Sequence, residues 1–289
     1  MSNPLHAAHY ADCAIQLDVI VEARRTLAKE TYAVRLRCPE IASRITPGQF
    51  LMIRASRGTD PMLGRAFAVY DVIRDDHGEA VSIDVVFHVV GKLTQILADI
   101  PPGSPLVVWG PLGNGFQLQA SDHLIMVAGG IGQTPFLALA KECLGLETFG
   151  SRAPTRFPQV SLCYGARSAE LLAGVDDFKN VGVEVHVATD DGSAGFHGLV
   201  TKLLEDRVAL STNESIQIVC CGPEPMMEAV AKYCVGANVP CLVSLETPMA
   251  CGLGICFSCV APVIQADGNW DFKRTCVDGP VFDAKSLAW

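Results

Sequence analysis

The chain has 289 residues, 49% of them hydrophobic, and its 22 Lys and Arg against 31 Asp and Glu give a formal net charge of −9 at pH 7. This length suffices for two domains and a smaller third part. The acidic balance excludes a nucleic-acid-binding protein, which needs a basic surface, and no apolar run is long enough to span a membrane.

The start of the chain and its scattered cysteines indicate a cytoplasmic protein. Met1 to Cys13 lack a basic stretch followed by an apolar one, so no signal peptide is expected. Several of the twelve cysteines lie mostly in apolar runs, which is typical of buried thiols in a reducing compartment. They are Cys13, Cys38, Cys143, Cys163, Cys220, Cys234 and Cys241.

Residues 1–119 read as an antiparallel β-barrel. Short alternating or β-branched runs, separated by turn signals such as Thr46-Pro47-Gly48, predict strands at 14–25, 31–38, 49–56, 66–74 and 81–90. A short helix at 93–99 and a strand at 106–109 are expected to follow.

Two stretches of this barrel contain candidate cofactor-binding residues. Arg65 opens a strand beside small residues, where a guanidinium meets a flavin pyrophosphate; the alternative is a solvated arginine at a strand end. His88 ends a strand that runs into Gly91 and a helix start, which makes an anion-binding corner. The alternative there is an ordinary turn and helix cap with a satisfied strand histidine.

Residues 120–247 alternate strands with helices, which predicts a doubly wound α/β domain with a parallel sheet. Strands are expected at 123–127, 159–164, 183–188 and 216–221, and helices at 136–146, 168–172, 199–206 and 225–233. The first strand enters a loop with Gly129, Gly130 and Gly132, whose free N–H groups suit a nucleotide pyrophosphate. Because Pro135 holds the last position of the usual G-x-G-x-x-G pattern, a tight structural turn is the alternative.

A second loop of this domain is expected to face the same ligand as the glycine loop, because ligands of parallel sheets bind at the carboxyl ends of the strands. It contains Cys221, Gly222 and Pro223. Cys221 contacts a nicotinamide in one interpretation and is a buried thiol in the other. Arg167-Ser168 either meets the 2′-phosphate of NADPH or only starts a helix, so the choice between NADH and NADPH stays open.

Residues 248–289 carry the most specific pattern. Cys251, Cys256 and Cys259 follow a C-x4-C-x2-C spacing, and Cys276 comes after sixteen intervening residues, which indicates the ligand set of a [2Fe–2S] cluster. Glycines between them let the chain curl around the metal. A structural zinc site and ordinary free thiols are the alternatives. Apolar neighbours suit either a docking surface or a small core beneath the loop: Met249, Leu253, Ile255 and Phe257.

Barrel, nucleotide domain and cluster in this order resemble the ferredoxin-reductase superfamily and, within it, the electron-transfer subunits of NAD-dependent dihydroorotate dehydrogenases. The resemblance covers nearly everything from about residue 14. The segments that carry it, besides the cysteines, are Pro47-Gly48-Gln49-Phe50, residues 110–116, the Gly-Gly-Ile-Gly loop, residues 189–193, Cys221-Gly222-Pro223 and residues 278–282.

The resemblance implies that FAD lies between the two larger domains. The segments that match the family's flavin contacts are Arg65, Ala66, Phe67 and Ala68, then Val86, Phe87 and His88, then Leu93 and Thr94. Alanines replace a proline and a serine of the family pattern, His88 replaces an arginine, and Leu93 replaces a glycine. Backbone contacts to the flavin are therefore expected to matter more here.

The resemblance also implies a function in pyrimidine biosynthesis. A nicotinamide exchanges two electrons as hydride and a cluster exchanges one, so a flavin must stand between them. Electrons would pass between NAD(H), FAD, the cluster and the FMN of a catalytic dihydroorotate dehydrogenase subunit, in a heterotetramer. No catalytic acid or base for the pyrimidine is evident in this chain. The alternatives are an NAD(P)H-dependent reductase subunit that serves a sulfite reductase, hydrogenase or sulfur reductase, and a zinc-stabilised module without enzymatic activity.

Overall fold

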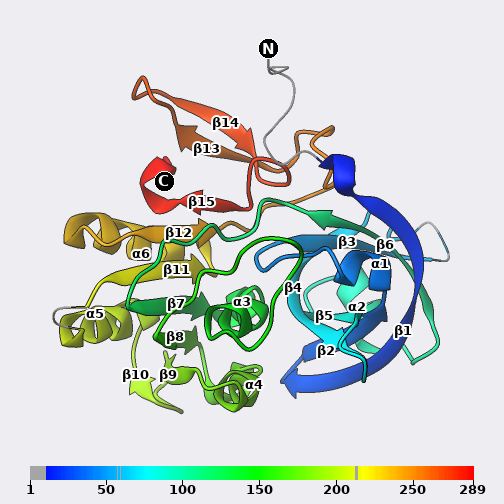
Figure 1. The fold of residues 1–289 in the computed structure, drawn as a ribbon, viewed down its shortest axis with the longest axis horizontal. Coiled ribbons are helices and arrows are strands. Elements are labelled where there is room, and N and C mark those ends of the chain that lie inside the picture. The colour runs from blue at the N-terminus through cyan, green and yellow to red at the C-terminus, as the bar shows by residue number, and fades with distance from the viewer. Residues whose placement is uncertain (1–10, 57, 59, 212–213) are drawn as a thin grey trace.

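The first part of the chain is a closed antiparallel barrel with the strand order β1-β2-β5-β4-β3-β6 (Figure 1). The computed structural model describes residues 11–289 except 57, 59, 212 and 213. Val34 and Leu36 of β2 are buried in the barrel, while Arg35 and Arg37 between and after them reach outward, as a period of two requires. The strands are β1 Ile15–Ala28, β2 Thr31–Arg37, β3 Phe50–Ala55, β4 Arg65–Arg74, β5 Ala80–His88 and β6 Pro105–Leu112.

Two short helices close the barrel. Helix α1 (Pro39–Ala42) packs Ile41 and Ala42 into the barrel core, and α2 (Lys92–Ala98) packs Leu93 and Leu97 into the same core. The Thr94 hydroxyl accepts hydrogen bonds from the N–H groups of Val90 and Gly91, both at 3.0 Å, and so caps α2.

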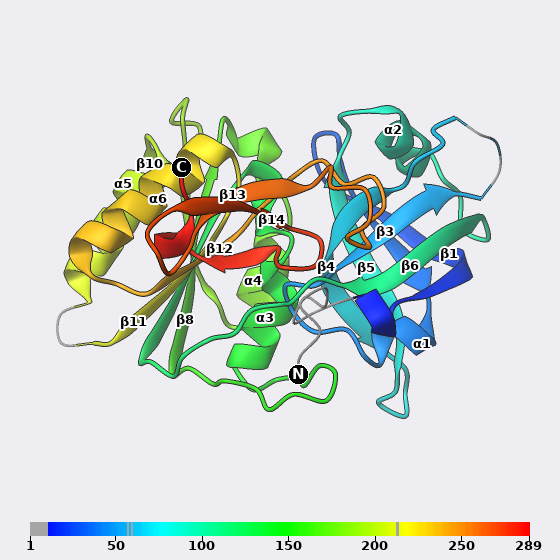
Figure 2. The same ribbon diagram turned by 90° about the horizontal axis from the view of Figure 1, so that it is seen from above.

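The second part is a parallel sheet with helices on both faces. Strand β7 is buried along its whole length, as expected for a strand covered on both sides. Helices α3 and α4 cover one face of the sheet, and α5 and α6 cover the other (Figures 1 and 2). The strands are β7 His123–Gly129, β8 Gln159–Ala166, β9 Glu184–Thr189, β10 Phe196–His197, β11 Ile216–Cys221 and β12 Cys241–Ser244; the helices are α3 Phe136–Cys143, α4 Val175–Asn180, α5 Val200–Leu210 and α6 Glu224–Ala237.

The third part is joined to both larger ones. After the cysteine loop, β13 (Val260–Ile264) and β14 (Trp270–Arg274) form a hairpin that projects at one side of the molecule (Figure 1). Strand β15 (Val281–Asp283) then pairs antiparallel with β12, so the sheet has the order β10-β9-β8-β7-β11-β12-β15. The last part of the chain therefore completes the sheet of the nucleotide domain.

The barrel and the third part share one hydrophobic core. Its buried members are Phe50, Met52 and Leu112 from the barrel and Cys259, Cys276 and Val277 from the third part. Asn114, just after β6, strengthens this junction: its backbone N–H donates to the Gly279 carbonyl at 2.8 Å, and its amide exchanges two hydrogen bonds with the backbone of Val281 at 2.8 and 3.1 Å.

The expected strands are all present, with small shifts at their ends. The prediction of a helix at 168–172 is wrong: that stretch holds only a short 3₁₀ turn, Ala169–Leu171, because Ser168 and Leu172 on either side have extended backbone. Cys13 is exposed, whereas the other scattered thiols are buried. None of the helices in the described part of the chain has the length and apolar character needed to cross a membrane.

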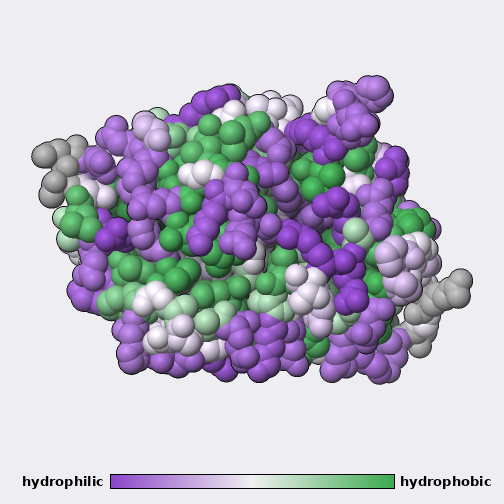
Figure 3. Space-filling model, turned by 90° about the horizontal axis from the view of Figure 1, so that it is seen from below, coloured by the Kyte–Doolittle hydropathy of each residue, from purple (hydrophilic) through white to green (hydrophobic). Residues whose placement is uncertain are grey.

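Apolar side chains are not confined to the core. On the face drawn in Figure 3, hydrophobic residues gather in patches bordered by polar ones. The cysteine loop and the hairpin also expose large apolar side chains, which are Ile255, Phe257, Ile264, Trp270 and Phe272. Exposed apolar groups that gather in one place mark contact surfaces.

Candidate functional sites

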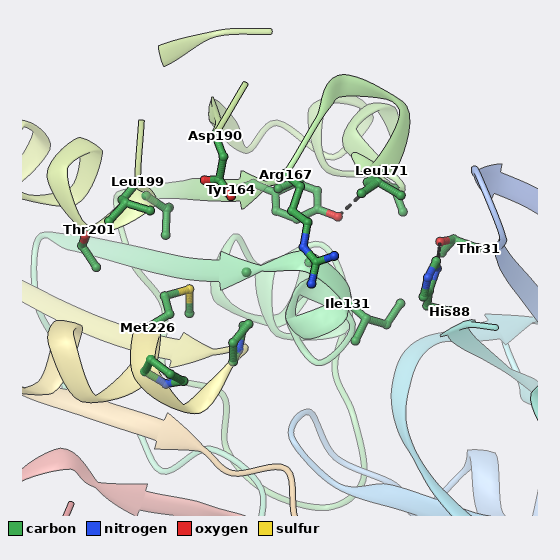
Figure 4. Close-up of a pocket in the computed structure, with 18 of the residues that line it drawn as sticks. Thr31, His88, Ile131, Tyr164, Arg167, Leu171, Asp190, Leu199, Thr201 and Met226 are labelled. Carbon is green, nitrogen blue, oxygen red and sulfur yellow. Dashed lines mark hydrogen bonds between the residues drawn. The ribbon is translucent and has the colours of Figure 1, made fainter. Parts of the chain in front are cut away.

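A cavity of about 670 Å³ lies at the carboxyl ends of the parallel strands. Gly129 ends β7 and Gly130 follows it, residues 164–166 end β8, Asp190 follows β9 and Pro223 follows β11. The barrel supplies the opposite wall through Thr31, His88 and Val90 (Figure 4). A ligand at this edge of the sheet is therefore bound between the two larger domains.

The three glycines of the first loop differ in how closely other atoms approach them. Gly130 has a φ of +55° and no atom within 4 Å of where a Cβ would lie, and it lines the cavity. A Cβ at Gly132 would lie 2.2 Å from the Cys221 carbonyl oxygen, and one at Gly129 would lie 2.5 Å from the Met226 sulfur. Gly129 and Gly132 thus allow the two loops to approach closely, while Gly130 offers backbone to a ligand.

The second loop contributes less than its sequence predicts. Pro223 lines the cavity, but Cys221 and Gly222 are not among the described residues of its wall. Burial raises the pKa of Cys221 to about 12, so this thiol is neutral near pH 7. Contact between Cys221 and a nicotinamide stays a prediction.

The cavity wall is mostly apolar but carries two charged side chains. The Arg167 guanidinium, after β8, points into the cavity, and Asp190 lies after β9 (Figure 4). Sequence reasoning missed much of the wall: Thr31, Tyr164, Leu171, Leu199, Thr201 and Met226. The signal that was available was their place near the carboxyl ends of strands or the starts of helices.

His88 has a defined orientation at the barrel side of the cavity. The Thr31 hydroxyl donates to the Lys29 carbonyl at 3.1 Å and lies 3.1 Å from His88 Nδ1. Because the single hydroxyl proton is already donated, Nδ1–H is the donor to Thr31. Nε2 is then the ring nitrogen left for a ligand.

The other predicted flavin contacts lie on both sides of the barrel wall. Phe67 and Phe87 pack edge to face inside it, with ring centroids 5.9 Å apart, and Leu93 is also in that core. Val86 is buried in the interface core with the nucleotide domain, and Thr94 caps α2. For these buried residues, only backbone groups are free to meet a cofactor.

The stretch at the start of β4 fits a flavin better. Ala66 and Ala68 are half-buried on the outside of the barrel, so they leave room for a flat ligand. Arg65 donates only to the carbonyls of Leu63 and Gly64, at 3.2 and 2.9 Å, and within the described residues it has no carboxylate partner. A free guanidinium beside small residues is suited to a pyrophosphate.

The four predicted cluster ligands lie around one loop but differ in exposure. Cys259 and Cys276 are each 1% exposed and their sulfurs are 3.1 Å apart, whereas Cys251 is half-buried and Cys256 is exposed. Gly252 and Gly254 adopt φ values of +71° and +78° that turn the loop around the sulfurs. The Leu253 N–H donates to Cys251 Sγ at 3.3 Å.

The surroundings favour thiolates at two of these positions. Hydrogen bonds from Ser258 lower the pKa of Cys256 to about 6, and a hydrogen bond from the Cys276 thiol lowers the pKa of Cys259 to about 6. Thiolate is the form that binds metal. Across the described ranges, no three His, Cys, Asp or Glu side chains are grouped around one metal position. Each iron of a [2Fe–2S] cluster takes only two protein ligands, so a buried pair and an outer pair fit it.

Three family descriptions match consecutive parts of the chain. An oxidoreductase FAD-binding domain matches residues 18–116, and an oxidoreductase NAD-binding domain matches residues 126–232. The iron-sulfur cluster binding domain of dihydroorotate dehydrogenase B matches residues 246–288. The barrel therefore binds FAD, the α/β domain binds NAD, and the metal of the cysteine loop is an iron–sulfur cluster and not zinc.

Similar proteins and structures extend over nearly the whole chain. The electron transfer subunit of dihydroorotate dehydrogenase B (NAD(+)) from Desulforamulus reducens is 35% identical over 94% of this chain and 98% of its own length. The same subunit from Bacillus caldolyticus is 34% identical over 91% and 95%. A solved structure of an NADH-dependent reduced ferredoxin-NADP oxidoreductase is 27% identical, covers 94% of this chain and 90% of its own, and has a TM-score of 0.77.

These similarities agree with the order of the domains and with the ligand loop described above. The ferredoxin reductase of carbazole 1,9a-dioxygenase, at 24% identity and a TM-score of 0.64, shares the fold over 78% of this chain and 67% of its own. The identity to the curated relatives, over more than nine-tenths of both chains, is decisive. This chain belongs to the family of electron transfer subunits of dihydroorotate dehydrogenase B.

Proposed function

We propose that this chain passes electrons between NAD(H) and the FMN of a partner catalytic subunit that interconverts dihydroorotate and orotate in pyrimidine biosynthesis. One observation carries the proposal: the barrel contacts both other functional regions. His88 lines the nucleotide cavity, and Ala66 packs against the core that contains Cys259 and Cys276. A flavin on the barrel is then between the nicotinamide and the cluster.

The chain's own residues bind and orient the cofactors. When bound, FAD accepts two electrons as hydride and releases them singly, which a nicotinamide and a cluster cannot do with each other directly. Arg65 holds the FAD pyrophosphate while Ala66 and Ala68 leave space for the ring. Gly130 offers its backbone to the nicotinamide nucleotide, and the apolar cavity wall excludes water from the hydride path. The ligands Cys251, Cys256, Cys259 and Cys276 hold the cluster.

An apolar stripe beside the cluster supports a partner subunit. Ile255 and Phe257 are 68% and 63% exposed, whereas Met249 and Leu253 pack into the core shared with the barrel. The outer face of the hairpin continues this surface. Trp270 and Phe272 pack edge to face at 5.2 Å, and the Arg274 guanidinium lies over the Phe257 ring at 5.3 Å.

We define this docking stripe as Ile255, Phe257, Trp270 and Phe272. It suits a partner that must bring its flavin close to Cys256, the exposed ligand. We further propose that two copies of each subunit form a heterotetramer. None of the twelve cysteines, all within the described part of the chain, forms a disulfide, which supports a reducing, cytoplasmic location.

Reconstitution with the catalytic subunit tests this function. The isolated chain, loaded with FAD and iron, should reduce an artificial one-electron dye with NADH but should not form orotate. Addition of the FMN-containing dihydroorotate dehydrogenase subunit should produce NAD-linked orotate formation. Orotate formation by the chain alone, or failure to couple with that subunit, would contradict the proposal.

A second partner type is favoured by one comparison. The 27% identical structure is an NADH-dependent reduced ferredoxin-NADP oxidoreductase, so in that protein this fold works with ferredoxin. If the chain instead co-purifies with a sulfite reductase, hydrogenase or ferredoxin-linked subunit, it is an NAD(P)H-linked reductase subunit. The rates of dye reduction with NADH and with NADPH identify the coenzyme that the chain uses.

A further inference from the structure

Trp109 occupies the junction between the FAD-binding barrel and the cluster loop. It lies on β6, opposite Met52 of β3 and Gln16 of β1. Its neighbours Val107 and Val108 are buried, and Trp109 itself is half-buried on the outer side of the barrel, next to the core shared with the cluster ligands. A large aromatic ring at this place bridges two parts of the chain that are far apart in sequence.

One side of the Trp109 ring lies against the start of the flavin stretch. A Cβ at Gly64 would lie 2.6 Å from Trp109 Cη2 and 3.3 Å from Cζ3, so only glycine allows this contact. Gly64 directly precedes Arg65 and Ala66. The position of the ring and the path of these residues are therefore fixed together.

The other side of Trp109 holds a cluster ligand. Its indole N–H donates to the carbonyl of Cys251 at 2.9 Å. The adjacent Gly252 lies against Met52, since a Cβ there would lie 2.7 Å from Met52 Cγ. One side chain thus spans the distance from the residue before the flavin stretch to the backbone of a ligand.

We propose that Trp109 is the positioning residue that sets the geometry between the flavin and the cluster. This inference rests on the proposed placement of FAD at residues 65–68. Electron transfer slows steeply with distance, and supporting groups outside the ligand shell determine how accurately a cofactor is held. Without the indole, the Cys251 side of the loop is no longer fixed to the barrel wall.

Two substitutions remove the contacts of the indole in steps. W109F keeps an aromatic ring on β6 but removes the N–H and the outer ring atoms Cη2 and Cζ3 that lie against Gly64, whereas W109L removes the aromatic ring as well. W289F, at an exposed tryptophan whose side chain forms no hydrogen bond with the described residues, is the matched control. FAD content, iron content and the visible circular dichroism of the cluster are measured for each loaded protein before any kinetics.

Rapid mixing with NADH then resolves the individual steps. NADH gives FAD two electrons as hydride, and FAD passes them one at a time to the cluster and on to an added one-electron dye. Flavin reduction should keep its wild-type rate in every variant. Cluster reduction should slow about tenfold in W109L and less in W109F, and both should change the cluster's circular dichroism.

The possible outcomes are distinct. If W109F and W109L load both cofactors and reduce the cluster at the wild-type rate with an unchanged spectrum, the inference is overturned. If W109L fails to load, W109F alone decides: a changed spectrum with slower cluster reduction supports the inference, and wild-type behaviour refutes it. If wild-type protein binds FAD and iron but NADH never reduces its cluster, the proposed function fails instead.

Discussion

The nucleotide cavity and the cluster loop are built in opposite ways. The cavity wall is assembled from loops that follow four different strands and from a barrel wall, so no single segment forms it. The cluster ligands belong to one short loop plus Cys276, and two of them are part of a core shared with the barrel. Changes in the cavity should therefore alter binding and leave the fold intact, whereas changes at the cluster can alter the fold.

The largest expected effect is on stability, when a substitution in the buried cysteine pair is compared with one in the outer pair. Cys276→Ser removes a ligand and places an unpaired hydroxyl in the shared core, at a cost of about 3 kcal/mol in the free energy of unfolding. Cys256→Ser removes an exposed ligand and should lose the iron–sulfur absorption yet keep FAD. Iron content, FAD content and thermal unfolding measure the difference. Equal melting temperatures for the two variants would show that the shared core does not stabilise the barrel.

A substitution at Gly130 tests the cavity side of the comparison. Gly130→Leu directs a side chain into the cavity and should raise KM for NADH about tenfold or more, with FAD content nearly unchanged. Gly78→Leu is the matched control, because Gly78 also has a positive φ, +84°, and no atom within 4 Å of its would-be Cβ, but lies in a turn between β4 and β5. Loss of FAD from Gly130→Leu would mean that this loop serves the flavin.

A charge on the docking stripe should affect coupling and nothing else. Ile255 is better suited than Phe257, because Arg274 lies over Phe257 and would neutralise a carboxylate there. Ile255→Glu should weaken coupling to the catalytic subunit severalfold while dye reduction by NADH stays the same. Ile20→Glu, at an exposed site on β1, is the control. Unchanged coupling in the titration with the catalytic subunit would exclude Ile255 from the interface.

The smallest effect on stability is expected at one of several polar contacts between the two larger domains. Asp177 of α4 accepts hydrogen bonds from Arg25 of the barrel, at 3.1 and 2.7 Å, and from the Tyr70 hydroxyl at 2.7 Å. Burial raises the pKa of Asp177, but these bonds outweigh it and hold the pKa below its usual value of 3.8. This contribution is therefore complete above pH 3.8 and is lost as pH falls through the lower, folded-state pKa.

Asp177→Asn should lower the free energy of unfolding by about 1 kcal/mol at neutral pH. The difference from wild type should shrink in acid, where the wild-type carboxyl is protonated as well. Denaturant unfolding at several pH values measures it. If the difference in the free energy of unfolding stays constant at the lowest pH measured, the effect is due to packing and not to charge.

The difference between the cavity, which many segments build, and the cluster loop, which one segment builds, also explains what the sequence alone could predict. Strand periods and turn residues were sufficient for the barrel and for strands β7, β8, β9 and β11 of the sheet, but not for β10, β12 and β15. Cysteine spacing was sufficient for the cluster loop. Both signals are local. Thr31 begins β2 of the barrel, Tyr164 lies near the end of β8 and Met226 lies in α6, so the fold brings these distant residues to one cavity and no short pattern encodes that.

The structure or role of several other residues was also beyond prediction. The segment at 168–172 forms only a 3₁₀ turn, although its composition is compatible with a helix. Thr94 and Leu93 match the family's flavin segment, yet the capping of α2 and the barrel core occupy their side chains. The roles of Trp109 and Asn114 depend on contacts across more than a hundred residues of sequence and carry no motif.

Strand β15 has a consequence for how the protein is made. It covers the edge of β12, and its first residue, Val281, and nearby Gly279 form hydrogen bonds with Asn114 beside the barrel. During synthesis on the ribosome, that edge stays uncovered until residues 281–283 have emerged, long after the rest of the sheet is complete. An open strand edge is prone to pair with other nascent chains. Pairing of β15 therefore replaces the longer β12 edge with a strand of only three residues, and it does so late in synthesis.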